Sequence, residues 1–256
     1  MRIANPIYDA AFKYLLEYNQ LAKFILFTIL NEEVSDLEFR PQERIVAIGS
    51  RHLTVYRLDF AARINNAAGE YRQVLIEIQK AKLDTDIMRF RRYLGEQYRD
   101  ANNIKPVVTV EGKDEKATGR HKQALPLLTI YFLGHSLEHS KAPVIHVCRD
   151  CYDLTTGEKL SEKESFIESL THDSYIIQIP HLRHERRSEI EELLQIFDQE
   201  YISGGKSGIV NRHILEINEE EIPERYRPIL CRLQKAIAEQ EVVEAMDLED
   251  EVLCEL

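Results

Sequence analysis

The chain has 256 residues and a net charge of −11, with 44% hydrophobic and 30% charged side chains. This length predicts one large domain, or one domain with an appendage, and it suffices to bury a sizeable core. The apolar run at residues 24–30 is too short to span a bilayer, so no membrane partner is expected. Four cysteines without a disulfide-rich pattern indicate a reducing compartment, and a cytoplasmic location is predicted.

The negative charge is concentrated after residue 215. Residues 216–256 contain thirteen acidic and four basic side chains and carry −9 of the −11, which leaves −2 for the other 215 residues. This distribution argues against strong, non-specific electrostatic binding to DNA. It says little about a site elsewhere in the chain. The acidic stretch is typical of a solvated helix end or a disordered terminus. A DNA mimic that covers a basic face is the alternative.

The first sixty residues predict two helices and a strand. Asn5 is a plausible N-cap and Pro6 a plausible first helical residue. The apolar positions of this helix are Ile7, Ala10, Ala11, Tyr14, Leu15 and Tyr18. Asp9 and Lys13 lie off this face at i, i+4, which is the spacing of an exposed ion pair. Residues 19–30 predict a buried second helix, and residues 36–48 a strand that Pro41 interrupts.

A β-hairpin is predicted within residues 52–80, where two strand-like runs flank a turn cluster at residues 65–70. If the hairpin is centred on Ala68, residues whose numbers are symmetric about 68 face each other. Asp59 and Glu77 then become cross-strand neighbours, with their Cβ atoms roughly 5 Å apart.

Two carboxylates held this close repel each other, and a divalent cation is the usual remedy. Side chains alternate along a strand, so Gln79 shares the face of Glu77, whereas Ile78 and Lys80 lie on the other. We therefore expect Asp59, Glu77 and the Gln79 carbonyls to bind a cation.

The chain after the hairpin predicts a helix from an N-cap at Asp84 to about residue 102. Its expected core positions are Ile87, Phe90, Leu94 and Tyr98, and its arginines, which lie mostly off that stripe, are Arg89, Arg91, Arg92 and Arg99. These arginines form either a solvated face or a surface along a phosphate backbone, because the planar guanidinium suits phosphate oxygens.

The remaining elements predict a mixed α/β architecture, and the hairpin makes the sheet mixed rather than wholly parallel. Strands are expected at residues 106–110, 125–133, 144–152 and 175–179, a short capped helix at 161–170, helices at 185–201 and 223–246, and a hinge at 203–208. The Cys148 and Cys151 pair lacks the second pair that a structural zinc needs, so packing is the simpler interpretation. A Walker-type loop at 205–207 lacks its first glycine and a leading strand.

Three stretches together resemble the PD-(D/E)XK nuclease superfamily, and more closely its Rpn-type recombination-promoting nucleases, the PD-(D/E)XK nuclease family transposases. Residues 5–16 resemble the family's opening D-x-x-F-K helix, and residues 57–59 its metal-binding Asp strand. Residues 76–79 with the Arg- and Tyr-rich segment 88–98 resemble its I-E-x-Q … R-x-x-Y block. The likeness covers about the first half of the chain.

The resemblance implies a restriction-endonuclease-like core at residues 1–182 and a helical region with an acidic tail at 183–256. It also implies a metal-dependent DNA endonuclease associated with transposition or recombination. Mg²⁺ or Mn²⁺ would be held by Asp59, Glu77 and the carbonyl of Ile78, since oxygen ligands select hard cations. Asp9 would support the site from the first helix.

Gln79 departs from the superfamily pattern, because it stands where a lysine usually orients the attacking water. The Rpn-like branch shares this departure. Lys80 is a doubtful substitute, since alternation points it away, whereas Lys13 would have to reach in from the first helix. The expected nucleic-acid contacts are Lys13, Lys80, Arg89 and Arg92. A non-catalytic DNA- or protein-binding module and an RNA-directed nuclease stay as alternatives, and a homodimer is left open.

Overall fold

The protein has an α/β fold in which helices flank a mixed sheet, as the sequence predicts. The computed structural model describes residues 1–41, 46–48, 51–53, 60–66, 69–80, 86–104, 124–162, 164–182, 188–204 and 210–255. The predicted strand at 106–110, the N-cap at Asp84 and the Walker-like loop lie outside these residues.

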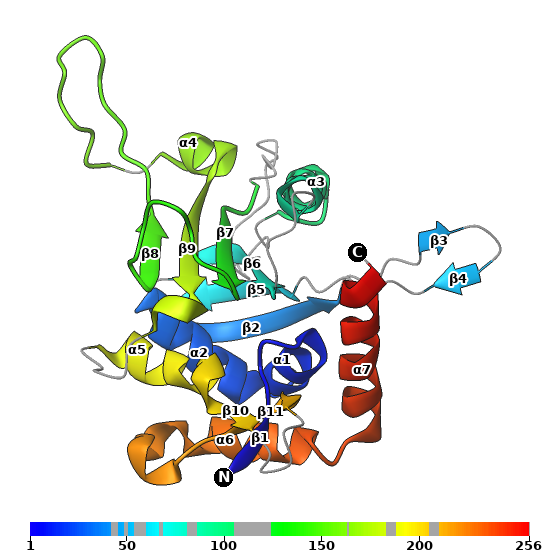
Figure 1. Cartoon of the computed structure of the whole chain (residues 1–256). Coiled ribbons are helices and arrows are strands. Elements are labelled where there is room, and N and C mark those ends of the chain that lie inside the picture. The colour runs from blue at the N-terminus through cyan, green and yellow to red at the C-terminus, as the bar shows by residue number, and fades with distance from the viewer. Residues whose placement is uncertain are drawn as a thin grey trace, which may run out of the picture.

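Six strands form the central sheet (Figure 1). In spatial order they are β2 (Val34–Pro41), β5 (Phe60–Asn66), β6 (Tyr71–Gln79), β7 (Leu127–Leu133), β9 (His172–Gln178) and β8 (Val144–Val147). The β2–β5, β5–β6 and β8–β9 pairs are antiparallel, whereas β6–β7 and β7–β9 are parallel. The central strands β6 and β7 are buried on both faces, as parallel strands between helical layers usually are.

The described helices are α1 (Asp9–Leu16), α2 (Asn19–Leu30), α3 (Asp86–Arg99), α4 (Ser165–Leu170), α5 (Glu189–Leu194), α6 (Arg227–Ala236) and α7 (Gln240–Glu255). Short 3-10 helices occur at Ile179–His181, Gln195–Phe197, Gln199–Tyr201, Glu219–Glu221 and Glu224–Tyr226. The single helices predicted at 185–201 and 223–246 are therefore wrong, because each stretch is broken into shorter elements. The predicted helix at 161–170 begins only at Ser165.

A second, three-stranded sheet joins the N-terminal strand to residues 202–216. Strand β1 (Arg2–Ala4) pairs with β11 (Val210–Glu216), which also pairs with β10 (Ile202–Gly204). A separate pair, β3 (Val46–Ile48) with β4 (Arg51–Leu53), lies outside both sheets. Two strands, β10 and β11, therefore lie between the helices of the region 183–256.

The first helix begins later than its capping signal predicts. Asn5 is buried, and its side-chain amide donates to Gln199 Oε1 and to the Arg212 carbonyl, each at 2.8 Å. The residue therefore ties β1 to the second sheet, and the N-cap of α1 is Tyr8. The predicted core stripe is also displaced, because Tyr18 is 49% exposed.

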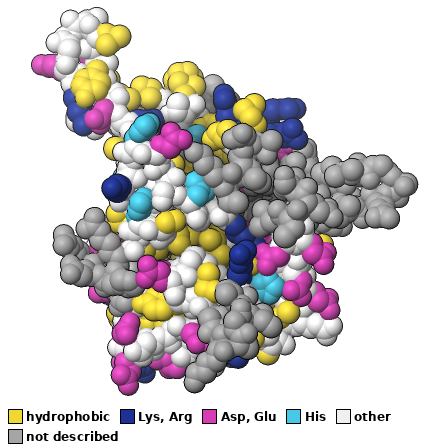
Figure 2. Space-filling model, in the orientation of Figure 1, with side chains coloured by type: hydrophobic (Ala, Val, Ile, Leu, Met, Phe, Trp, Pro, Cys, Tyr) yellow, Lys and Arg dark blue, Asp and Glu magenta, His cyan; other side chains and the backbone are white. Residues whose placement is uncertain are grey.

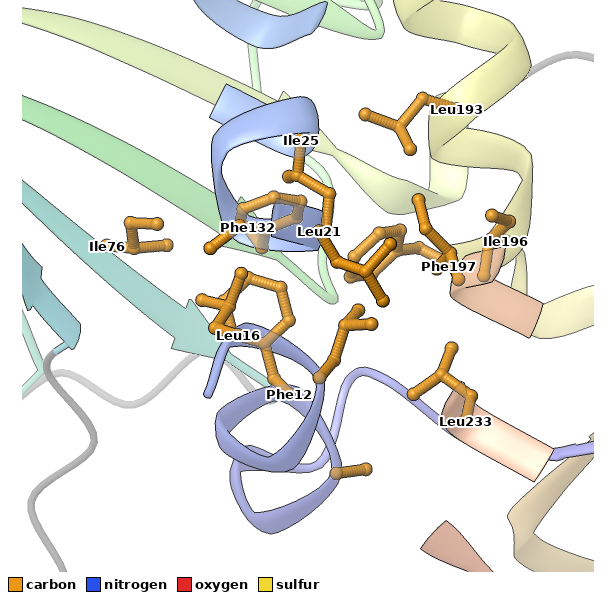
Figure 3. Close-up of a cluster of buried hydrophobic side chains, with 14 of the residues drawn as sticks. Phe12, Leu16, Leu21, Ile25, Ile76, Phe132, Leu193, Ile196, Phe197 and Leu233 are labelled. Atoms are coloured by element: carbon orange, nitrogen blue, oxygen red, sulfur yellow. The ribbon is translucent and has the colours of Figure 1, made fainter. Parts of the chain in front are cut away.

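The main core lies between the central sheet and the layer formed by α1, α2 and α6 (Figure 3). Phe12, Phe132 and Phe197 pack against one another near its centre, with ring centroids 4.9–5.9 Å apart. One cluster contains Ile76 of the sheet together with Leu233 of α6, so residues from both sides of position 182 share this core.

Helix α3 covers the opposite face of the sheet (Figure 1). Its buried apolar residues are Phe90 and Tyr93, whereas Ile87 is 59% exposed and Tyr98 43% exposed. The predicted core stripe is therefore wrong for Ile87 and Tyr98. Of the helices within the described ranges, none combines the length and apolar character needed to cross a membrane.

Candidate functional site

The hairpin register predicted around Ala68 is confirmed as far as the structure describes it. Phe60 pairs with Ile76, and Ala61 pairs with Leu75, so the residue numbers of each pair are symmetric about 68. Asp59 lies outside the described residues. It directly precedes Phe60, and the same ladder continued by one step would pair it with Glu77.

Gly69 closes the hairpin with a backbone conformation that glycine adopts readily. Its φ is +77°, a left-handed value that strains most L residues. The Gly69 N–H donates to the Asn66 carbonyl at 2.9 Å, and Asn66 N–H donates to the Glu70 carbonyl at 3.1 Å. This tight connection fixes the register of the two strands.

Strand β6 presents different chemistry on its two faces. Ile76 and Ile78 point into the main core. Glu77 is 2% exposed, and it pairs in register with Tyr131 of β7. Burial raises the pKa of the Tyr131 hydroxyl, and the nearby Glu77 carboxylate raises it further. The ring of Phe90 on α3 meets the Tyr131 ring edge-on at 4.5 Å, which covers this layer.

The donors on this face suit a hard cation. A carboxylate that is almost fully buried is costly unless a positive group or hydrogen bonds compensate it. Glu77 is such a carboxylate, because it is 2% exposed. Backbone carbonyl oxygens, which its neighbours on the strand carry, are also ligands that Mg²⁺ and Mn²⁺ bind. The pair with Asp59 stays a prediction. Among the residues that the structure describes, no group of three or more His, Cys, Asp or Glu side chains is placed to hold a metal.

Gly134 allows the end of β7 to lie against the backbone that follows Glu77. The Gly134 N–H donates to the Gln79 carbonyl at 2.7 Å. A Cβ atom at Gly134 would lie 2.5 Å from the Lys80 carbonyl oxygen and 3.1 Å from that of Gln79. Any side chain here would therefore move the backbone at the candidate site.

Asp9 and Lys13, the two polar residues predicted on the first helix, have different environments. Asp9 is only 7% exposed, whereas Lys13 is exposed. The interpretation of an exposed Asp9–Lys13 pair is therefore wrong for Asp9. The backbone N–H groups of Asp9 and Ala10 donate to the carboxylate of Glu249 on α7, at 3.2 and 3.0 Å.

Lys80 lies on the face opposite Glu77, as alternation predicts, and it contacts α7. Its Nζ is 2.7 Å from Glu249 Oε2 and 3.7 Å from Asp250 Oδ1, and it sits 3.2 Å from the centre of the Tyr8 ring. Asp250 also accepts a 2.9 Å hydrogen bond from the Tyr8 hydroxyl and lies 2.9 Å from His213 Nε2.

Sequence reasoning missed this group of Tyr8, Lys80, His213, Glu249 and Asp250. Its members come from four distant segments, and Tyr8 and Asp250 are 242 residues apart in sequence. The acidic excess of residues 216–256 was the available signal, because it pointed to a basic partner surface. The interpretation of a disordered tail is wrong, since α7 runs to Glu255.

The other predicted polar residues are distributed over the surface. Arg91, Arg92 and Arg99 of α3 are exposed, whereas the side chain of Arg89 lies outside the described part of the structure. Cys148 is exposed rather than packed, and the His146 ring stacks on Tyr175.

Comparison of the chain with protein-family models, with curated proteins and with solved structures found no match.

Proposed function

We propose that this chain is a metal-dependent DNA endonuclease with a restriction-endonuclease-like core, of the type found in Rpn-like recombination nucleases. The observation that supports the proposal is the pairing of Phe60 with Ile76, because the same register continued by one residue would pair Asp59 with Glu77. The order of elements supports it. Helices α1 and α2 precede strands β2, β5 and β6, and α3 connects β6 to the parallel strand β7.

In this proposal the carboxylates of Asp59 and Glu77 and the carbonyl of Ile78 hold Mg²⁺ or Mn²⁺. Such an ion neutralises charge on a phosphate oxygen and lowers the pKa of a bound water. Gln79, on the same strand face as Glu77, hydrogen-bonds the attacking water but supplies no charge. Asp9 supports the site from α1.

The DNA backbone would lie along the exposed arginines Arg91 and Arg92 of α3. Lys13 is exposed and free to reach a phosphate from α1, and Arg89 remains an expected contact. The substrate would be cytoplasmic DNA, with cleavage serving transposition or recombination.

Nicking of supercoiled plasmid tests this proposal. We expect nicking with Mg²⁺ or Mn²⁺ and none in EDTA, and a loss of about 100-fold or more in Asp59→Asn and in Glu77→Gln. Glu38→Gln is the matched control, since Glu38 is an exposed carboxylate on strand β2 of the same sheet. Cleavage at the wild-type rate in Asp59→Asn would refute the assigned site.

The non-catalytic binding module is the second candidate, because Gln79 replaces the usual lysine. DNA binding without metal-dependent nicking by the wild-type protein would favour it. Incubation with an RNA strand of the same sequence, in the same buffer, tests the third candidate. Cleavage of the RNA without nicking of the plasmid would favour an RNA-directed nuclease.

A further inference from the structure

Helix α7 places a carboxylate where it contacts one cation and two backbone N–H donors. Glu249 accepts hydrogen bonds from the Asp9 and Ala10 N–H groups at the start of α1, and it pairs with the Lys80 ammonium at 2.7 Å. The N-cap residue of α1, Tyr8, makes no side-chain hydrogen bond to the N–H groups of this helix end. The positive end of the α1 dipole and Lys80 therefore face an acid supplied by α7.

Asp250 makes a second attachment on the same helix. Its carboxylate binds the Tyr8 hydroxyl and His213, each at 2.9 Å, and Asp247 lies 3.6 Å from His213 Nδ1. Burial raises the pKa of Tyr8, as do its hydrogen bond to Asp250 and the negative charges around it, so the hydroxyl remains a donor. Figure 2 shows the acidic side chains gathered over α7, beside Lys or Arg side chains and a histidine.

The described side chains of α7 change in character along the helix. Among the side chains described for this helix, Val242 and Met246 are buried, at 8% and 2% exposure. Both lie in the first half. The residues that follow include Asp247, Glu249 and Asp250, which make charged or polar contacts with His213, Lys80 and Tyr8, and Leu248, which is 37% exposed. The Lys80 and Glu249 side chains are only 15% and 18% exposed, so Lys80 needs an anionic partner at this position and a competing anion must displace Glu249 to reach it.

We propose that the second half of α7 is an autoinhibitory latch that keeps Lys80 from a DNA phosphate until DNA displaces it. This inference rests on the proposed function, because Lys80 follows Glu77 and Gln79 directly at the end of β6. In the closed arrangement the acids of α7 neutralise Lys80 and repel the DNA backbone. A bound phosphate takes the place of Glu249 as the partner of Lys80, and the anchored first half of α7 stays on the core.

DNA affinity of charge-neutralised variants tests the latch. We would measure binding of a fluorescent duplex by anisotropy in EDTA, so that no cleavage contributes. Glu249→Gln/Asp250→Asn should bind about tenfold more tightly than wild type, because the closed state loses its charged contacts. The matched control Glu244→Gln/Glu251→Gln removes two exposed charges from the same helix and should stay within about twofold of wild type.

Adding Lys80→Met to the latch variant should reverse most of its gain, since Lys80 is the group that the latch releases. Equal affinity of the latch variant and the control pair would overturn the latch and leave the proposed function intact. Failure of every protein to bind duplex DNA would instead remove the proposed function, and the latch with it.

Amide hydrogen exchange on the wild-type protein provides a readout that does not depend on the variants folding. Saturating duplex should speed exchange in the second half of α7 and leave α6 unchanged. Exchange in α7 that is unchanged or slowed by DNA would contradict the latch.

Discussion

The two faces of strand β6 bury different kinds of residue. Ile76 and Ile78 join a core that extends across the sheet through α1 and α2 to α6. On the other face, Leu75 and Glu77 are buried in the layer beneath helix α3. The same strand therefore contributes to the main apolar core and carries a buried carboxylate one residue away.

This difference shows how a fold can accommodate a costly group. The layer under α3 also buries polar side chains, among them Gln97, Asn103 and Thr129. These groups hydrogen-bond one another or their neighbours. The Asn103 amide donates to the Gln97 carbonyl at 2.8 Å, and the Thr129 hydroxyl donates to Ser174 Oγ at 2.8 Å. Stability supplied by the larger core leaves this layer free to hold polar, chemically useful residues.

Truncating one apolar residue on each face is the strongest test of this contrast. Ile76→Ala should lower the free energy of unfolding by about 4–5 kcal/mol, and Leu75→Ala by about 2–3 kcal/mol. The layer beneath one helix relaxes around a cavity more easily than the closed core does. Urea denaturation measures both values. A larger loss for Leu75→Ala than for Ile76→Ala would reverse the proposed roles of the two faces.

Adding a methyl group at Gly134 should disturb the site end of β6. Gly134→Ala should lower the free energy of unfolding by about 1–3 kcal/mol, because the new Cβ would overlap the Lys80 carbonyl. Plasmid nicking should fall with it, since the Gln79 backbone must shift. Gly95→Ala on α3 is the matched control: its Cβ meets nothing within 4 Å, and helix propensity predicts a gain of up to about 1 kcal/mol. Equal stability of Gly134→Ala and Gly95→Ala would contradict the close approach of Gly134 to the Lys80 carbonyl.

The smallest expected effect is a pH dependence at the edge of the α3 layer. Burial lowers the pKa of His172, Arg149 lowers it further and Asp173 opposes them, while the Tyr98 hydroxyl of α3 lies 3.0 Å from Nδ1. The folded state therefore favours the neutral His172 ring. As the pH falls, the unfolded chain protonates this ring at a higher pH than the folded protein does. The resulting stability is complete above the unfolded pKa of about 6.5 and is lost as the pH falls below it.

Urea denaturation at about pH 7.5 and about pH 5.5 measures this dependence. His172→Asn should lose less stability between the two pH values than the wild-type protein loses. A larger loss of stability in His172→Asn than in the wild-type protein would contradict a lowered pKa of His172.

Local patterns predicted the hairpin and the mixed sheet, because register follows from alternation and from a tight turn. They failed where distant partners decided the structure. The capping signal of Asn5 was overridden by its bonds to Gln199 and Arg212, about 200 residues away. Apolar periodicity at 223–246 could not reveal the break between α6 and α7, where Ala238 N–H bonds to the Lys235 carbonyl.

The candidate site shows the same limit. The sequence placed Glu77 and Gln79 on one face and Lys80 on the other, since this needs only the period of a strand. It could not predict that Lys80 meets Glu249, because that contact depends on how α7 packs beside α1 (Figure 1). Asp59 is the one predicted ligand whose position stays a prediction.

Calorimetric titration of metal-free protein with Mn²⁺ tests the central claim most directly, since it needs neither DNA nor turnover. We predict one bound ion in the wild-type protein and in Glu38→Gln, and loss of that binding in both Asp59→Asn and Glu77→Gln. Wild-type affinity in Glu77→Gln would contradict the claim that the two acids of this hairpin share a metal ion.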